Sequence, residues 1–295
     1  MSNTLKILSR PKGNAEEYGR WSVNPYKGCS HGCLYCYLKK GVWANGLGGN
    51  TAELKTGVVN EDHAYHLAMA EIIEHREEII KDGGLFMTFT SDPCAPETRQ
   101  LFFRIANCAI QRHIPVTVLT KSTEVWNDEL FYQMRSLYEY RKNIAFGWTL
   151  TGHDELEPNA PSNSDRIRDL HIVRSHFFKV WASIEPVIDF SSALDMICQA
   201  LDAGCEHFKI GLLTNNTRVV RKPFSFGEHH FEAYDRAACM SFTGNVMELT
   251  QGRATVYWKQ SFYDFFGDHG MTAYEFLHQW SHSVDKDWNM FQTNK

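Results

Sequence analysis

Long apolar segments are missing from this chain of 295 residues, which contains no run of eighteen or more apolar residues. Its first twenty residues also lack the apolar core of a signal peptide. We therefore expect a cytoplasmic protein with no membrane-spanning helix. In a reducing compartment, its eight cysteines are expected to be metal ligands, reactive thiols or small buried side chains rather than disulfides.

Internal repeats, low-complexity linkers and a large excess of one charge are absent as well. The formal net charge of -5 gives no overall attraction to nucleic acid, so only a local basic patch could bind it. Residues 217–224 (TRVVRKPF) offer such a patch, although most runs of this kind are solvated loops. The 43% hydrophobic and 22% charged content is ordinary for a globular protein with a sizeable core.

What the sequence does contain is an alternation of short apolar runs with longer amphipathic segments. The short runs are rich in β-branched and aromatic residues and predict buried strands at 21–26, 85–90, 116–121, 144–151, 178–188 and 207–213. Helical spacing predicts helices at 62–81, 96–112, 127–140, 165–176 and 191–203. No G-x-G-x-x-G follows the first strand, which argues against a Rossmann sheet.

This alternation predicts an α/β fold, namely a partial (β/α)6 barrel of the TIM type with parallel strands. We expect an N-terminal arm at 1–20, the barrel at 21–213 and an aromatic extension at 214–295 that covers the open side of the barrel. The segment 255–262 could add one more strand. The aromatic residues of the extension are Phe262, Phe265, Phe266, Tyr274, Phe276, Trp280 and Trp288.

Three cysteines stand close together directly after the first predicted strand, in the stretch NPYKGCSHGCLYCY. Cys29, Cys33 and Cys36 have the spacing C-x3-C-x2-C, and no fourth cysteine follows within fifty residues. A structural zinc site needs four ligands, so zinc would have to recruit His31 or Cys94. A [4Fe–4S] cluster held by three thiolates would instead leave one iron open for another ligand.

This motif, with Tyr35 just before the third cysteine, resembles the radical S-adenosylmethionine (SAM) superfamily. Further motifs in the order TSDP, TKS and LEPNAPSNSDRI are similar to the spore photoproduct lyase-like branch, over about residues 21–213. The resemblance implies a [4Fe–4S] cluster on Cys29, Cys33 and Cys36. It also implies that SAM binds the open iron and, after reduction by a flavodoxin or ferredoxin, yields a 5′-deoxyadenosyl radical that takes hydrogen from a substrate.

The resemblance also implies residues that bind SAM. Tyr35 is expected near the adenine, and Ser91, Lys121 and Thr149 match polar positions at the ends of the predicted strands. Asp92 could accept a hydrogen bond from the methionine ammonium, and Lys121 could pair with the methionine carboxylate. The alternatives are ordinary ones: Ser91 or Asp92 could cap the next helix, Lys121 could be a surface lysine and Thr149 a good strand former.

Three further residues are candidates for the chemistry itself. Tyr37 could relay a hydrogen atom, or it could be a half-buried aromatic with one hydrogen bond. Cys94 lies near the end of a strand and is a candidate reactive thiol. Glu185 closes an apolar strand, so it should meet a ribose hydroxyl, a substrate amine or a basic side chain such as Lys121 or Lys209.

One position departs from the lyase pattern. In spore photoproduct lyase a cysteine precedes the Thr-Ser-Asp run and returns hydrogen to the product, whereas Phe89 stands there in this chain. The sequence therefore predicts modification or isomerisation of a substrate, perhaps best sought among modified pyrimidine nucleobases in DNA, rather than repair of spore photoproduct. Modification of a peptide or small metabolite is the alternative activity, and a zinc-stabilised nucleic-acid-binding module is the alternative without catalysis.

Overall fold

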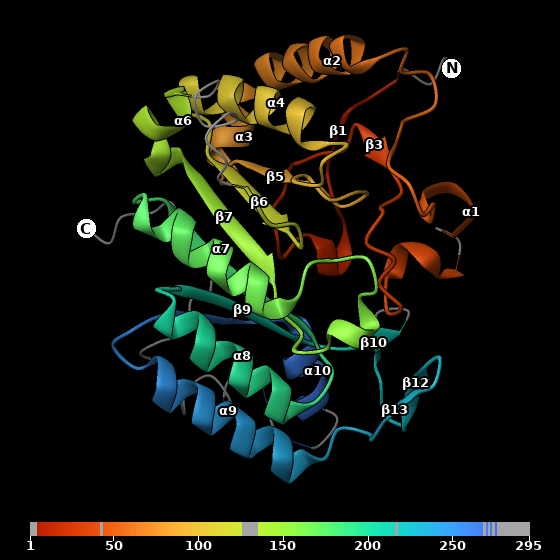
Figure 1. Cartoon of the computed structure of the whole chain (residues 1–295), viewed down its shortest axis with the longest axis vertical. Helices are drawn as coiled ribbons and strands as arrows, with labels where there is room; N and C mark the ends of the chain where they lie inside the picture. Colours follow the sequence, from red (N-terminus) through yellow and green to blue (C-terminus); the bar gives the residue numbers. More distant parts are fainter. Residues whose placement is uncertain are drawn as a thin grey trace.

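A computed structural model describes residues 5–41, 44–125, 135–215 and 218–267, together with residues 270, 272 and 275. One eight-stranded sheet organises this part of the chain, in the spatial order β1-β2-β5-β6-β7-β8-β9-β14 (Figure 1). Strands β2 to β14 pair in parallel, and β1 pairs antiparallel with β2 at one edge. The strands are β1 (Leu8–Ser9), β2 (Ser22–Val23), β5 (Leu85–Met87), β6 (Val116–Thr120), β7 (Ile144–Thr149), β8 (Lys179–Val187), β9 (His207–Leu212) and β14 (Thr255–Trp258).

Each of the six predicted strands has a counterpart in the sheet, which confirms the partial barrel. The segment 255–262 supplies β14, which pairs in parallel with β9. The first predicted strand is divided into β2 and β3 (Tyr26–Lys27), and β3 leaves the main sheet to pair with β4 (Glu53–Leu54). The division places the three cysteines directly after β3, beyond the edge of the main sheet.

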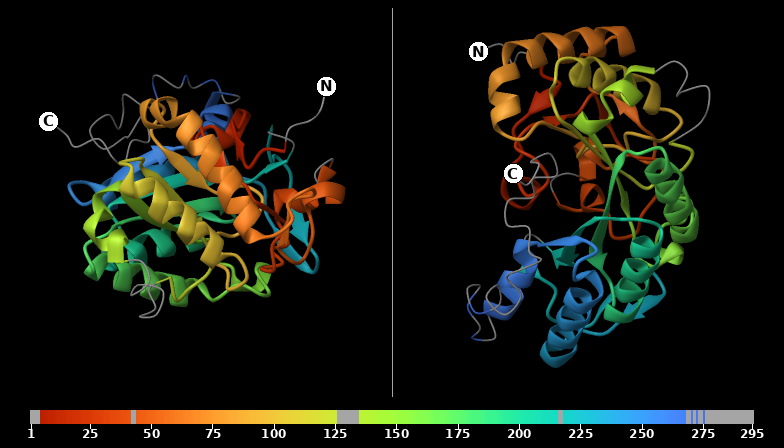
Figure 2. Two further views of the ribbon diagram at one scale, coloured as in Figure 1. Left: turned by 90° about the horizontal axis from the view of Figure 1, so that it is seen from above. Right: turned by 90° about the vertical axis from the view of Figure 1, so that its left-hand side faces the viewer.

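Helices follow the strands and lie along the outside of the curved sheet, as the two views of Figure 2 show. Side chains start several of them: Asn60, Ser162, Asp189 and Asp235 each accept a hydrogen bond from a backbone N–H of the first turn. The helices are α1 (Ala44–Leu47), α2 (Glu61–Glu74), α3 (Arg76–Lys81), α4 (Arg99–Gln111), α6 (Arg135–Glu139), α7 (Asn163–Ser175), α8 (Phe190–Asp202), α9 (Arg236–Thr250) and α10 (Gln260–Gly267).

The helix predictions are correct in kind and differ at the boundaries. The predicted helix 62–81 is two helices, because α2 ends and α3 begins at His75. The predicted helix 96–112 begins only at Arg99, after the turn in which the Thr98 hydroxyl donates to the Asp92 carbonyl at 2.5 Å. Of the predicted helix 127–140, the segment 126–134 lies outside the described residues.

The C-terminal part continues the same architecture, because α9 connects β9 to β14 and packs on α8. Two small hairpins come first, formed by β10 (Thr214–Asn215) with β11 (Arg218–Val219) and β12 (Phe224–Phe226) with β13 (His229–Phe231). Phe262, Phe265 and Phe266 are buried. The other predicted aromatic residues of the extension, Tyr274, Phe276, Trp280 and Trp288, lie outside the described residues. No helix in the described part of the chain is long and apolar enough to cross a membrane.

Tight packing between β7 and β8 gives a stability prediction. A Cβ added to Gly147 would lie 2.1 Å from the buried indole of Trp181 on the neighbouring strand. We expect Gly147→Ala to lower the free energy of unfolding by about 1–3 kcal/mol, because a packed core resists added volume. Urea denaturation measures the change, with Gly46→Ala as the control, since an added Cβ there meets nothing within 4 Å. An unchanged denaturation midpoint for Gly147→Ala would contradict the packing.

Candidate active site

The three cysteines lie in one loop between β3 and the short helix Tyr37–Lys39. All three thiols are free, and Cys33 is buried while Cys29 and Cys36 are partly exposed. Burial, followed by the charges of Asp92 and Cys33, raises the pKa of Cys29 to about 12. The thiols therefore lie within electrostatic reach of one another, and they would need a metal to hold them as thiolates.

Two glycines shape this loop. Gly28 has a φ of +82°, and an added Cβ would lie 2.2 Å from the Thr51 carbonyl oxygen. Gly32 has a φ of +72° and lies against Asn159, whose backbone N–H donates to the His31 carbonyl at 3.1 Å. The loop therefore turns as predicted, and it is held against the segment that follows β7.

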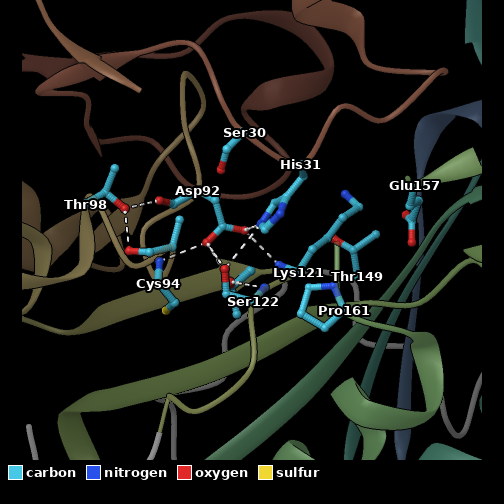
Figure 3. Close-up of polar contacts among 12 residues, drawn as sticks. Ser30, His31, Asp92, Cys94, Thr98, Lys121, Ser122, Thr149, Glu157 and Pro161 are labelled. Atoms are coloured by element: carbon cyan, nitrogen blue, oxygen red, sulfur yellow. Dashed lines mark hydrogen bonds and ion pairs between the residues drawn. The ribbon is translucent and has the colours of Figure 1, made fainter. Parts of the chain in front are cut away.

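Asp92, which follows β5, ties the cysteine loop to the end of β6 (Figure 3). One carboxylate oxygen lies 3.0 Å from His31 Nε2 and accepts from the Lys121 backbone N–H at 2.8 Å. The other accepts from the hydroxyls of Thr120 at 2.6 Å and Ser122 at 3.3 Å. Burial alone raises the pKa of Asp92, but the charge of His31 and these hydrogen bonds outweigh it and hold that pKa below its usual range.

The contacts of Asp92 change the expectation formed from the sequence. Because protein donors occupy both carboxylate oxygens, the structure gives Asp92 a positioning role for the loop. A contact between Asp92 and the methionine ammonium would have to displace one of these donors, and it stays a prediction.

Three other predicted SAM-binding residues carry polar groups that the protein does not use. The Ser91 hydroxyl is buried and has no hydrogen-bond partner among the described residues. The Lys121 ammonium lies 5.5 Å from the ring centre of Tyr35 and forms no ion pair within the described residues. The Thr149 carbonyl at the end of β7 accepts from Arg166 at 2.9 Å, which leaves its hydroxyl to other partners. Because an unpartnered buried hydroxyl is unfavourable, this site fits a polar ligand beside the cysteine loop.

Tyr35 is fixed by a buried ion pair. Its hydroxyl donates to Glu157, and the other oxygen of Glu157 pairs with the Arg166 guanidinium, whose side chain is fully buried. Arg166 also donates to the carbonyls of Pro161 and Thr149, each at 2.9 Å. Burial and the Glu157 charge raise the pKa of Tyr35 well above its ordinary value. The segment after β7, which the sequence matched only as a motif, thus holds the tyrosine of the cysteine loop.

The two residues considered as a fourth zinc ligand have other contacts. His31 Nε2 faces Asp92 and lies 3.2 Å from the Ser122 hydroxyl. Cys94 is 1% exposed in the hydrophobic core, and Figure 3 shows its sulfur on the opposite side of Asp92 from His31. Among the described residues, no three His, Cys, Asp or Glu side chains converge on a site for one metal ion. A cluster places its thiolates on different iron atoms, so it does not require such convergence.

Tyr37 and Phe89 meet beside the cysteine loop. The Tyr37 hydroxyl donates to the Phe89 carbonyl, while 56% of the Tyr37 side chain stays exposed. The Phe89 ring stacks on Phe86 with 4.5 Å between ring centres. Position 89, where the lyase pattern has a cysteine, therefore directly contacts the candidate relay tyrosine.

Glu185 on β8 has a basic partner, but not one of those expected from the sequence. Its two oxygens lie 2.6 and 2.8 Å from Lys259 Nζ, and one of them accepts from the Tyr18 hydroxyl. The expected pairing with Lys121 or Lys209 is wrong, because Lys259 follows β14 and reaches Glu185 from the strand beyond β9. Lys209 instead donates to the Glu17 carbonyl.

Comparison with known proteins agrees with this geometry. No family model matches the chain. An uncharacterized protein of Methanocaldococcus jannaschii, MJ0683, is 27% identical over 179 residues, and the match covers 57% of this chain and 61% of that relative's length. The structure of spore photoproduct lyase complexed with dinucleoside spore photoproduct has a TM-score of 0.59 at 16% identity, over 88% of this chain and 81% of that one.

SuiB of Streptococcus suis, in a structure bound to S-adenosylmethionine, has a TM-score of 0.53 at 12% identity over 80% of this chain and 49% of that one. Both neighbours are radical SAM enzymes. The chain has the radical SAM fold. The resemblance to the spore photoproduct lyase-like branch is thereby confirmed at the level of the fold.

Within the radical SAM fold, sequence reasoning missed a second titratable cluster after β7. His153 Nδ1 lies 2.7 Å from Glu155 and Nε2 lies 2.6 Å from Asp189, the residue that caps α8. The ring also packs edge-on against Phe231 of β13, at 5.2 Å between centres. Burial alone lowers the pKa of His153, but the hydrogen bonds to Asp189 and Glu155 outweigh it and raise that pKa above 6.5.

This cluster predicts a pH dependence of stability. A histidine whose pKa is raised on folding stabilises the fold fully below 6.5 and loses that contribution as the pH rises through its raised value. The stability advantage of the wild type over His153→Gln should therefore be largest near about pH 6 and shrink toward about pH 9. Urea midpoints at several pH values test this, with His66→Gln, an exposed residue of α2, as control. An advantage that is constant with pH would show that His153 stays neutral.

Proposed function

We propose that the protein is a radical SAM enzyme that holds one [4Fe–4S] cluster on Cys29, Cys33 and Cys36 and binds SAM beside it. The observation that carries the proposal is the placement of three free thiols in one loop next to the unpartnered buried hydroxyl of Ser91. Three cysteine ligands are the donor set that leaves one iron of such a cluster open. When bound, the reduced cluster cleaves SAM to a 5′-deoxyadenosyl radical, which takes hydrogen from the substrate.

The residues of the chain have separate tasks in this proposal. Lys121 faces the cysteine loop with an ammonium that no described residue pairs, so it would bind the methionine carboxylate. Ser91 and Thr149 would donate hydrogen bonds to SAM, and Tyr35, fixed by Glu157, would pack beside the adenine. Asp92 keeps the loop in register with β6.

Electrons would enter through the cysteine loop from a flavodoxin or ferredoxin. Leu34 in that loop is 41% exposed, and the loop lies at the surface of the described structure rather than under a helix. A partner could therefore approach the cluster without rearrangement of the sheet.

For the substrate we propose a nucleobase, with a modified pyrimidine in DNA as the first candidate. The support is the fold shared with spore photoproduct lyase, whose structure contains a dinucleoside substrate. The product is expected to be a modified or isomerised base. Phe89 has no transferable hydrogen comparable with that of a thiol, so we do not expect repair by hydrogen return from this position.

The test of the proposed function is direct. Protein reconstituted anaerobically with iron and sulfide, reduced with dithionite and given SAM should form 5′-deoxyadenosine. Lys121→Met should retain the iron but bind SAM at least about tenfold more weakly, because it loses a charged contact. Absence of 5′-deoxyadenosine from fully loaded wild-type protein would refute the proposal.

A further prediction concerns Phe89. Loaded enzyme incubated with dinucleoside spore photoproduct should give no repaired dinucleotide above the rate of a cluster-free control, because Phe89 occupies the position of the thiol donor. Chromatography of the products measures repair. Efficient repair would mean that another residue returns the hydrogen atom, and Tyr37 beside the Phe89 carbonyl would be the first to examine.

A further inference from the structure

Glu185 is the one carboxylate that the structure places next to the aromatic residues facing Tyr37. Tyr18 of the N-terminal arm donates to Glu185 and packs against Phe86, Phe89 and Trp181, with ring centres 5.3 to 6.3 Å apart. The Glu185 charge also adds, after burial and Cys36, to the raised pKa of Tyr37. Glu185 therefore lies on the same side of the sheet as the candidate radical site.

The N-terminal arm brings Tyr18 to this position. Its beginning is held at α3, where Arg10 pairs with Asp82 at 3.1 Å. Its end is held at the far edge of the sheet, where the Glu17 carboxylate accepts from the Gln260 backbone N–H at 2.7 Å. The arm thus crosses from the first strands to β14, and Tyr18 is a fixed part of the arrangement.

The two oxygens of Glu185 are not equally used. Oε2 accepts from both Lys259 and Tyr18, whereas Oε1 accepts only from Lys259 among the described residues. A carboxylate oxygen accepts two hydrogen bonds, so Oε1 has one acceptor position left. The Glu185 side chain is 23% exposed while that of Lys259 is 5% exposed, so an incoming molecule can reach the carboxylate but hardly the ammonium.

The charge of this cluster is already balanced. Lys209 and Lys259 are matched by Glu17 and Glu185, with Lys259 also 3.5 Å from Glu17. A cationic substrate group would add an uncompensated charge in a largely buried place, which is unfavourable. A neutral N–H donor fills the remaining acceptor position without that cost.

We propose that Glu185 determines substrate specificity by accepting a hydrogen bond from the imide or lactam N–H of a flat, neutral heterocycle. This inference rests on the proposed function and names the chemistry of its substrate. The ring lies against Phe89 and Tyr18, which supply aromatic faces and edges for stacking. Lys259 and Tyr18 are positioning residues that keep the carboxylate ionised and correctly turned, and Gly211 lets it approach, since an added Cβ would lie 3.1 Å from Oε1.

The experiment measures binding by calorimetry to the full-length, cluster-loaded protein with SAM and without reductant. The probes are thymidine and guanosine, each compared with its counterpart methylated at N3 or N1, which lacks the N–H donor. Wild-type protein should bind one of the two nucleosides at least about tenfold more tightly than its methylated counterpart, a difference of about 1.4 kcal/mol. The nucleoside that binds identifies whether the imide or the lactam is the source of the N–H.

Variants separate recognition from folding. Glu185→Ala should lose the discrimination, and Glu185→Ala with Lys259→Met should lose it too while avoiding an unpaired buried lysine. Glu248→Ala, on the exposed side of α9, should keep it. The proposal is overturned if wild-type protein binds neither nucleoside, if methylation has no effect, or if the Glu185 variants still discriminate.

The proposed function can fail independently of this inference. Formation of 5′-deoxyadenosine from SAM in the absence of any nucleoside should be the same in wild type and Glu185→Ala, because Glu185 does not contact the cysteine loop. If neither forms it, the proposed function is wrong. If both form it and neither discriminates between nucleosides, only the role of Glu185 is wrong.

Discussion

Replacing Cys29, Cys33 and Cys36 together by alanine should remove all bound iron and abolish 5′-deoxyadenosine formation, while the fold persists. Anaerobically purified wild-type protein is expected to be brown and to carry about four iron atoms per chain. The variant should be colourless, since no other group of His, Cys, Asp or Glu in the described part of the chain can hold a metal ion. Iron and sulfide analysis with visible absorbance makes the measurement.

The matched control is Cys198→Ala, which removes a partly exposed thiol of α8 on the outside of the sheet. It should keep the full iron content and activity. Colourless wild-type protein that contains one zinc ion would contradict the prediction and would support the zinc-stabilised nucleic-acid-binding module. Brown triple-alanine protein would mean that the iron is bound elsewhere, and the proposed site would be wrong.

The strands of the fold were predictable because a parallel sheet inside helices needs short runs that are apolar on both faces. The run at 178–188 shows this well: β8 spans Lys179–Val187, and all but its first residue and Glu185 are buried. The break at His75 and the late start of α4 were not predictable from periodicity. Tertiary contacts such as that between Thr98 and the Asp92 carbonyl set those boundaries.

The candidate site was predictable where a local motif carries the chemistry, as with the cysteine loop. It was not predictable where the partners are far apart in sequence. Asp92 meets His31 across 61 residues and Glu185 meets Lys259 across 74, and no spacing rule connects them. For Lys259 there was one usable signal, since it directly follows the predicted strand at 255–262, where polar residues gather at the carboxyl ends of parallel strands.

The second large effect is expected at Arg166. Arg166→Met should lower the free energy of unfolding by about 3–5 kcal/mol, because it leaves the Glu157 carboxylate buried without its cation. Both side chains of this pair are 0% exposed, and Arg166 makes two further hydrogen bonds to backbone carbonyls. Urea denaturation of the purified protein measures the loss.

The same helix supplies the control. Arg168 also pairs with an acidic residue, Asp165, but its side chain is 69% exposed, so Arg168→Met should change the stability by less than about 1 kcal/mol. The double variant with Arg166→Met and Glu157→Met should recover part of the loss, since no unpaired charge then remains. Its remaining defect should appear in SAM binding, because Tyr35 no longer has the carboxylate that fixes its hydroxyl. Equal stability of the Arg166 and Arg168 variants would show that the buried pair does not hold this segment, and Tyr35 would then need another anchor.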